Sequence, residues 1–125
     1  MSYTAGIGTL ALKTGALSIA QATTDIASWS GLPASLRITK FTAFSPSGTL
    51  AVSAATIGLF DASGGGGNGI AAAALLTALT TTTGITDLTL TLPNLIITTG
   101  NLFVRNVIAG AAATCRFRVE YVDLT

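Results

Sequence analysis

The stretch that decides the fold is CRFRVEYV, residues 115–122, near the C-terminus. Apolar and charged side chains alternate along it with a period of two, which is typical of a β-strand with one buried face. The set that begins with Cys115 is expected to face a core. Most of the other set faces outward, where Glu120 is expected to form an ion pair across to a neighbouring strand.

Weaker versions of the same pattern run through most of the chain. They predict further strands at residues 9–13, 16–20, 36–44, 55–60, 87–92, 95–98 and 102–108. Short loops are expected to make hairpins of the first two, through Thr14-Gly15, and of the last two, through Thr99-Gly100-Asn101. Residues 21–34 lack alternation and predict a loop, whereas residues 70–83 predict either a strand or a short helical turn.

Turn signals recur every 8 to 12 residues in the second half of the chain, for instance at residues 99–101 and 110–112. That spacing is typical of antiparallel sandwiches and barrels rather than of alternating strands and helices. A length of 125 residues without an internal linker predicts one all-β domain over residues 1–125. Residues 1–34 are expected to be partly extended strands and a loop.

The composition is poor in charge. Only 9% of the residues are charged, 50% are hydrophobic, Thr and Ala supply 21 residues each, and the net charge is +1. This balance predicts neither a nucleic-acid partner nor a membrane surface. The absence of His excludes Ser-His-Asp catalysis and His-ligated zinc sites. A nearly neutral surface promotes association, so we expect much of it to be covered by other subunits.

The glycine-rich stretch 64–69 contains one literal match to the dinucleotide motif G-x-G-x-x-G. Residues 61–63 separate it from the preceding strand, whereas the motif follows a strand directly, and the flanking strands alternate with Thr. An interstrand loop is therefore the expected structure. The five carboxylates are spread over turns and strand ends, which predicts no catalytic pair and no calcium site. We expect no enzyme activity, no cofactor and no metal.

Several single residues leave more than one interpretation open. Trp29, with Leu32 and Pro33 nearby, could cover the core, anchor a partner or serve as a platform for a sugar. Arg37 and Lys40 are expected on opposite faces of one strand. Cys115 is expected to be a buried, inert thiol. The N-terminal residues carry no basic group and Lys13 interrupts the apolar stretch, so neither a secretory signal nor a membrane span is expected.

Two parts of the chain resemble a known class of proteins. The first is TIGLFDAS (56–63) followed by four glycines and AAAALLTAL (71–79), and the second is NLFVR (101–105) followed by residues 111–124. Together they resemble small β-rich virion proteins of tailed bacteriophages, of the kind encoded among head genes. The resemblance implies a β-sandwich of jelly-roll type that decorates or cements the capsid, often as a trimer.

The expected function is therefore that of a capsid decoration or cement protein, made in the host cytoplasm and located in the virion. Its expected partners are copies of itself, with a trimer favoured, and the phage major capsid protein. Candidate contact residues are Tyr3, Trp29, Leu32, Pro33, Gly64, Gly65, Gly66, Gly67 and Asn68. A tail, neck or fibre subunit is the first alternative, and a carbohydrate-binding module is the second.

Overall fold

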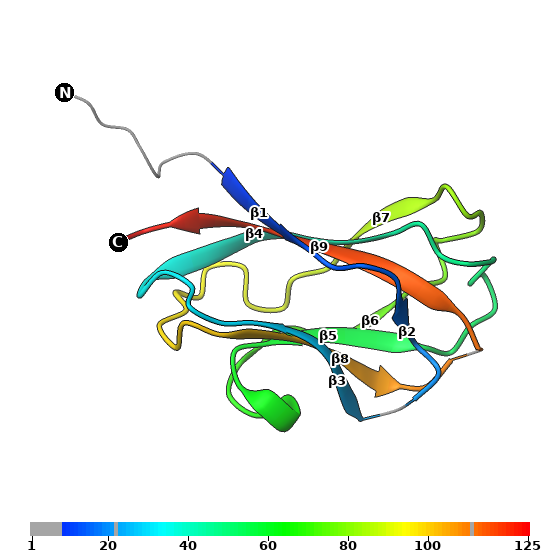
Figure 1. Cartoon of the computed structure of the whole chain (residues 1–125), viewed down its shortest axis with the longest axis horizontal. Coiled ribbons are helices and arrows are strands. Elements are labelled where there is room, and N and C mark those ends of the chain that lie inside the picture. The colour runs from blue at the N-terminus through cyan, green and yellow to red at the C-terminus, as the bar shows by residue number, and fades with distance from the viewer. Residues whose placement is uncertain (1–8, 22, 111) are drawn as a thin grey trace.

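Two antiparallel sheets packed face to face make up the protein (Figure 1). The computed structural model describes residues 9–21, 23–110 and 112–125. The strands are β1 (Thr9–Lys13), β2 (Leu17–Ser18), β3 (Thr24–Trp29), β4 (Leu36–Phe44), β5 (Thr56–Phe60), β6 (Gly69–Leu75), β7 (Ile85–Leu88), β8 (Leu102–Ile108) and β9 (Thr114–Asp123). The predicted all-β sandwich is thereby confirmed.

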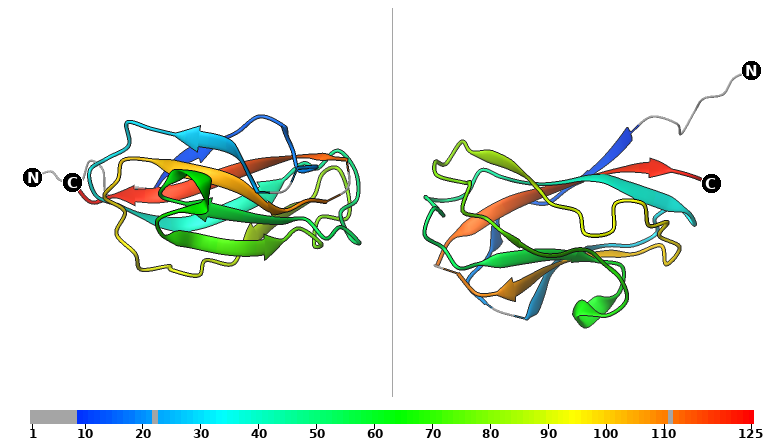
Figure 2. Two further views of the ribbon diagram at one scale, coloured as in Figure 1. Left: turned by 90° about the horizontal axis from the view of Figure 1, so that it is seen from below. Right: turned by 180° about the vertical axis from the view of Figure 1, so that it is seen from behind.

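The strands pair in a nested order. The five-stranded sheet has the order β1-β9-β4-β7, with β2 also on β9, and the four-stranded sheet has the order β3-β8-β5-β6. Early strands therefore pair with late ones: β1 and β2 with β9, β3 with β8, β4 with β7, and β5 with β6. Figure 2 shows the two layers from below and from behind, with β9 between β1 and β4.

The core lies between the two sheets, as the alternation in residues 115–122 predicts. Cys115, Phe117 and Val119 are fully buried and Tyr121 is nearly so. The rings of Phe41 on β4 and Phe117 stack with centroids 5.9 Å apart. Side chains of β5 and β8 fill the core from the opposite sheet. Burial of these apolar side chains is the main stabilising contribution to such a domain.

The prediction for the N-terminal third is wrong in two places. β1 and β2 do not form a hairpin through Thr14-Gly15, because both pair with β9 in sequence. Thr14 makes the break between them: its N–H donates to the Phe117 carbonyl, and its Oγ1 accepts from the Phe117 N–H at 3.0 Å. Residues 21–34 are not all loop either, because they contain the edge strand β3.

Residues 70–98 follow a different path from the predicted one. β6 is a strand, which decides between the two alternatives there, and β7 ends at Leu88 instead of continuing to residue 92. The chain then crosses to the other sheet, where the Thr91 N–H donates to the Ile70 carbonyl at 2.7 Å. Ile97 pairs with Leu36 rather than forming a hairpin with β8, so the strand predicted at 95–98 is only a single bridge.

A β-bulge in β4 changes which residues share a face. The register shifts between Ile38 and Lys40, so that Arg37 lies opposite Val122 and Lys40 opposite Glu120. Residues 120 and 122 point to the same side of β9, because side chains alternate along a strand. Arg37 and Lys40 therefore share the outer face, which corrects the prediction that they lie on opposite faces. The bulge adds one residue to β4 and so shifts the alternation.

Candidate partner-binding surfaces

The loop that carries Trp29 lies at one end of the sandwich. Trp29 ends β3 opposite Leu102, and both Trp29 and Leu32 are half-buried and pack against the core. The Leu32 N–H donates to the Gly100 carbonyl at 3.1 Å, which ties the loop to residues 99–101. Pro33 is half-buried beside it. Trp29 therefore packs against the protein's own core.

The glycine-rich stretch forms an exposed loop between β5 and β6. It begins with a 3-10 turn, Ser63–Gly65, and residues 63–68 are all exposed. A β-strand rather than a helix follows it, so the arrangement that a dinucleotide site requires is absent from this loop. Tyr3, the remaining contact candidate, and Ala111 lie outside the described residues.

Two carboxylates hold the glycine-rich loop in place. Asp61 accepts hydrogen bonds from the backbone N–H of Asn68 at 2.6 Å and from its Nδ2 at 2.9 Å. Asp25 on β3 accepts from the Gly64 N–H at 2.8 Å and from Arg105 Nη1 at 2.9 Å. Gly67 has a φ of +65°, and a Cβ there would lie only 2.2 Å from Asp61 Oδ1. The hydrogen bond from Gly64 to Asp25 thus holds the loop against the outer face of the four-stranded sheet.

The pKa of Asp25 reflects this arrangement. Partial burial acts to raise it, but the hydrogen bond from the Gly64 N–H and the hydrogen bond and charge of Arg105 outweigh burial. The pKa of Asp25 is therefore held below its ordinary value. The ionised carboxylate joins β3, β8 and the loop.

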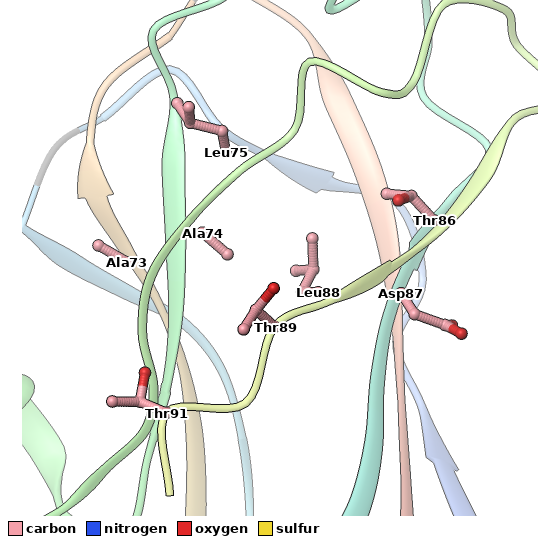
Figure 3. Close-up of a pocket in the computed structure, with 8 residues that line it drawn as sticks. All are labelled: Ala73, Ala74, Leu75, Thr86, Asp87, Leu88, Thr89 and Thr91. Atoms are coloured by element: carbon pink, nitrogen blue, oxygen red, sulfur yellow. The ribbon is translucent and has the colours of Figure 1, made fainter. Parts of the chain in front are cut away.

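A groove opens where the edge strands β6 and β7 face each other (Figure 3). We call it the edge groove; its volume is about 400 Å³. It is lined by Ala73, Ala74, Leu75, Thr86, Asp87, Leu88, Thr89 and Thr91. Leu88 and Thr89 extend toward β6, whereas the carboxylate of Asp87 points away (Figure 3). Thr91 Oγ1 accepts from the Ala72 N–H at 3.2 Å and joins the crossing segment to β6.

The outer face of the five-stranded sheet gathers most of the basic residues. Lys13 lies opposite Arg118 across β1 and β9, and Arg116 lies opposite Phe44 across β9 and β4. With Arg37 and Lys40, these make five of the six basic side chains of the protein. Asp87 and Glu120 lie on the same face. We call these seven residues the cationic face.

Neither the edge groove nor the cationic face could be predicted from the alternation and turn pattern of the sequence. The groove depends on the order of strands, which brings β6 and β7 to the same edge of the sandwich. The face depends on the bulge in β4, which spaces the buried residues Ile38 and Phe41 three positions apart where strict alternation gives two. No sequence pattern singled out Thr42 either, although its Oγ1 donates a hydrogen bond to Asp87 Oδ1 at 2.8 Å on this face.

The chemistry of the remaining groups is limited. Cys115 is fully buried, as predicted, and burial raises the pKa of its thiol to about 11. No group of three or more Cys, Asp or Glu side chains that could hold a metal occurs among the described residues. Over the same part of the chain, no helix has both the length and the apolar character needed to cross a membrane. No protein-family model, curated protein or solved structure matches the chain significantly.

Proposed function

We propose that this chain is a jelly-roll structural subunit that binds the outer surface of an assembled bacteriophage head. The observation that carries the proposal is the nested pairing of early with late strands, distributed over two packed sheets. A jelly roll has eight strands that follow such a path in two Greek keys. The described part of this chain has eight strands when β1 and β2, which both pair with β9, are taken together as one. Viral capsid proteins use this architecture widely.

The surface supports the same proposal. It carries few charges, and scattered apolar side chains such as Val52, Leu75 and Ile85 are more than half exposed. Interface cores are depleted of charged side chains, so a surface of this kind suits broad contacts between subunits. The proposed partners are the major capsid protein and further copies of this chain, with a trimer favoured.

The proposed mechanism is stabilisation by mass action. A subunit that binds the assembled shell, but not its dissociated proteins, stabilises each site by RT ln(1 + [L]/Kd). At a free concentration 100 times Kd this is about 2.7 kcal/mol per site. A trimer makes three contacts at once and gains avidity without any new kind of contact.

Co-sedimentation with heads tests the proposal directly. The protein is mixed with heads from the phage or prophage that carries its gene, prepared without this protein, and separately with unassembled capsid protein. We expect saturable binding to heads only, together with a higher temperature of head rupture. Heads that neither bind the protein nor gain stability would contradict the proposal.

Two further measurements separate the alternatives. Immunogold electron microscopy that places the protein on the tail, neck or fibres instead of the shell would favour the first alternative. Specific binding to a glycan array would favour the carbohydrate-binding module, because lectin domains also use the jelly roll. Sedimentation equilibrium gives the oligomeric state, for which we expect a trimer.

A further inference from the structure

The charges of this protein are distributed unevenly between its two sheets. The cationic face carries five basic residues and two carboxylates, a net charge of +3, whereas the whole chain carries +1. The sixth basic residue, Arg105, lies on the other sheet and is paired with Asp25 at 2.9 Å. A nearly neutral protein thus presents one distinctly positive side.

Pairing within the cationic face leaves three basic residues available to a partner. Lys40 Nζ lies 3.8 Å from Asp87 Oδ2, and Arg118 Nη2 lies 2.7 Å from Glu120 Oε2. The partner of Glu120 is therefore on its own strand, whereas the sequence predicted a partner on the adjacent strand. Lys13, Arg37 and Arg116 form no ion pair with any described carboxylate. Each lies on a different strand, so the three span the sheet from β1 to β4.

An apolar hollow lies within the same face. Lys13, Phe44, Ile85 and Arg118 line a pocket of about 90 Å³. Phe44 and Ile85 lie directly opposite each other across β4 and β7, and Ile85 is 65% exposed. The pocket is large enough for one small apolar side chain, with positive charge beside it.

We propose that the cationic face binds an acidic protein surface, one apolar side chain of which enters the pocket at Phe44 and Ile85. Charge complementarity selects the partner, because a net +3 favours carboxylates. The apolar pocket and the two interspersed carboxylates favour a protein over a nucleic acid, whose affinity comes mainly from contacts between basic residues and phosphates. Where the acidic surface is that of a phage head, the inference rests on the proposed function.

The test uses soluble probes, so that its result does not depend on heads. Binding of the full-length protein to poly-L-glutamate is measured at 50 and 300 mM salt, with poly-L-lysine and a double-stranded DNA oligonucleotide as comparisons. The variant Lys13→Gln/Arg37→Gln/Arg116→Gln removes the three available charges. The matched control, Lys13→Arg/Arg37→Lys/Arg116→Lys, keeps them, and circular dichroism verifies that both variants fold.

We expect the wild type and the charge-keeping control to bind poly-L-glutamate, more weakly at 300 mM salt, and not to bind poly-L-lysine. The Gln variant should bind about tenfold more weakly, which corresponds to about 1.4 kcal/mol shared among the three charges that it removes. Glu120→Gln should bind more tightly, because it raises the charge of the face by one.

Three results would overturn the inference: no binding of poly-L-glutamate, equal binding by the Gln variant, or binding of DNA at least as tight as that of poly-L-glutamate. The head experiment separates this inference from the proposed function. Heads that bind wild type and Gln variant equally contradict the cationic face alone. Poly-L-glutamate binding that is lost in the Gln variant, together with heads that bind no protein, contradicts the proposed function alone.

Discussion

Asp25 connects three separate segments through a single side chain. One oxygen accepts from the Gly64 N–H and the other from Arg105 Nη1, so β3, β8 and the glycine-rich loop meet at one carboxylate. Hydrogen bonds to charged groups contribute more than neutral ones, about 1.5–3 kcal/mol each where they are well formed. Here the side chains are partly exposed, and the contribution is correspondingly smaller.

The variant Asp25→Asn should lower the free energy of unfolding by about 1–2 kcal/mol at pH 7. The pKa of Asp25 is lowered in the folded protein, so its stabilisation is present above the ordinary value of 3.8 and is lost as the pH falls through the folded pKa. Urea unfolding of both proteins between pH 2 and 7 should show a difference that closes in acid. A difference that stays constant over this range would contradict the role of the charge.

At the scale of elements, alternation predicted the strands that have one buried face. β9 and β8 follow the pattern with little deviation, since their inner residues are buried between two sheets. β3 was missed because it is an edge strand whose residues are almost all half-buried, and a bulge between Asp25 and Ala27 interrupts it. Without a fully buried face there is no periodic signal to detect.

Partners of strands were harder to predict than the strands themselves. Thr14-Gly15 has the composition of a hairpin turn, yet β1 and β2 both extend along β9, more than 90 residues later in the chain. Local turn propensity could not reveal this, because the choice depends on which neighbour buries more apolar surface. The same holds for the candidate partner-binding surfaces. The Trp29 loop and the glycine-rich loop could be identified from the sequence, whereas the edge groove and the cationic face depend on the order of strands in the sheets.

The break between β1 and β2 makes a specific prediction about Thr14. Its hydroxyl accepts the Phe117 N–H at 3.0 Å and donates to the Gly15 carbonyl at 2.7 Å. Thr14→Val keeps the shape but leaves the Phe117 N–H without that acceptor, which should cost about 1–2 kcal/mol. Thr14→Ser keeps the hydroxyl and should stay within about 0.5 kcal/mol of wild type. Denaturant unfolding measures both, and a Val variant as stable as the Ser variant would refute the bond's importance.

At the scale of the whole molecule, β9 is the strand that joins the two ends of the chain. It lies between β1 and β4 and also pairs with β2, so three strands form their hydrogen bonds with this one ten-residue strand. Pairings between such distant segments slow folding, because the loop must close before any contact forms. Exposing the inner side of β9 therefore requires most of the sandwich to open.

Cys115 lies on that inner side and reports on this opening. Burial raises the pKa of its thiol from 9.0 to about 11, so both access and ionisation suppress its reaction in the folded state. At pH 8, labelling with a thiol-reactive disulfide reagent should proceed only as fast as global unfolding. The same shift makes stability decline as the pH rises above 9, because the unfolded thiol ionises first.

A second thiol provides the control for the labelling measurement. Thr98 is exposed, so Thr98→Cys should add one equivalent of rapid reaction while Cys115 stays slow. The slow phase should accelerate with urea in parallel with the unfolding rate measured by fluorescence of Trp29, because both probes lie in one cooperative sandwich. If Cys115 reacted as fast as the added thiol, or without dependence on urea, β9 would open locally and the central role assigned to it would be wrong.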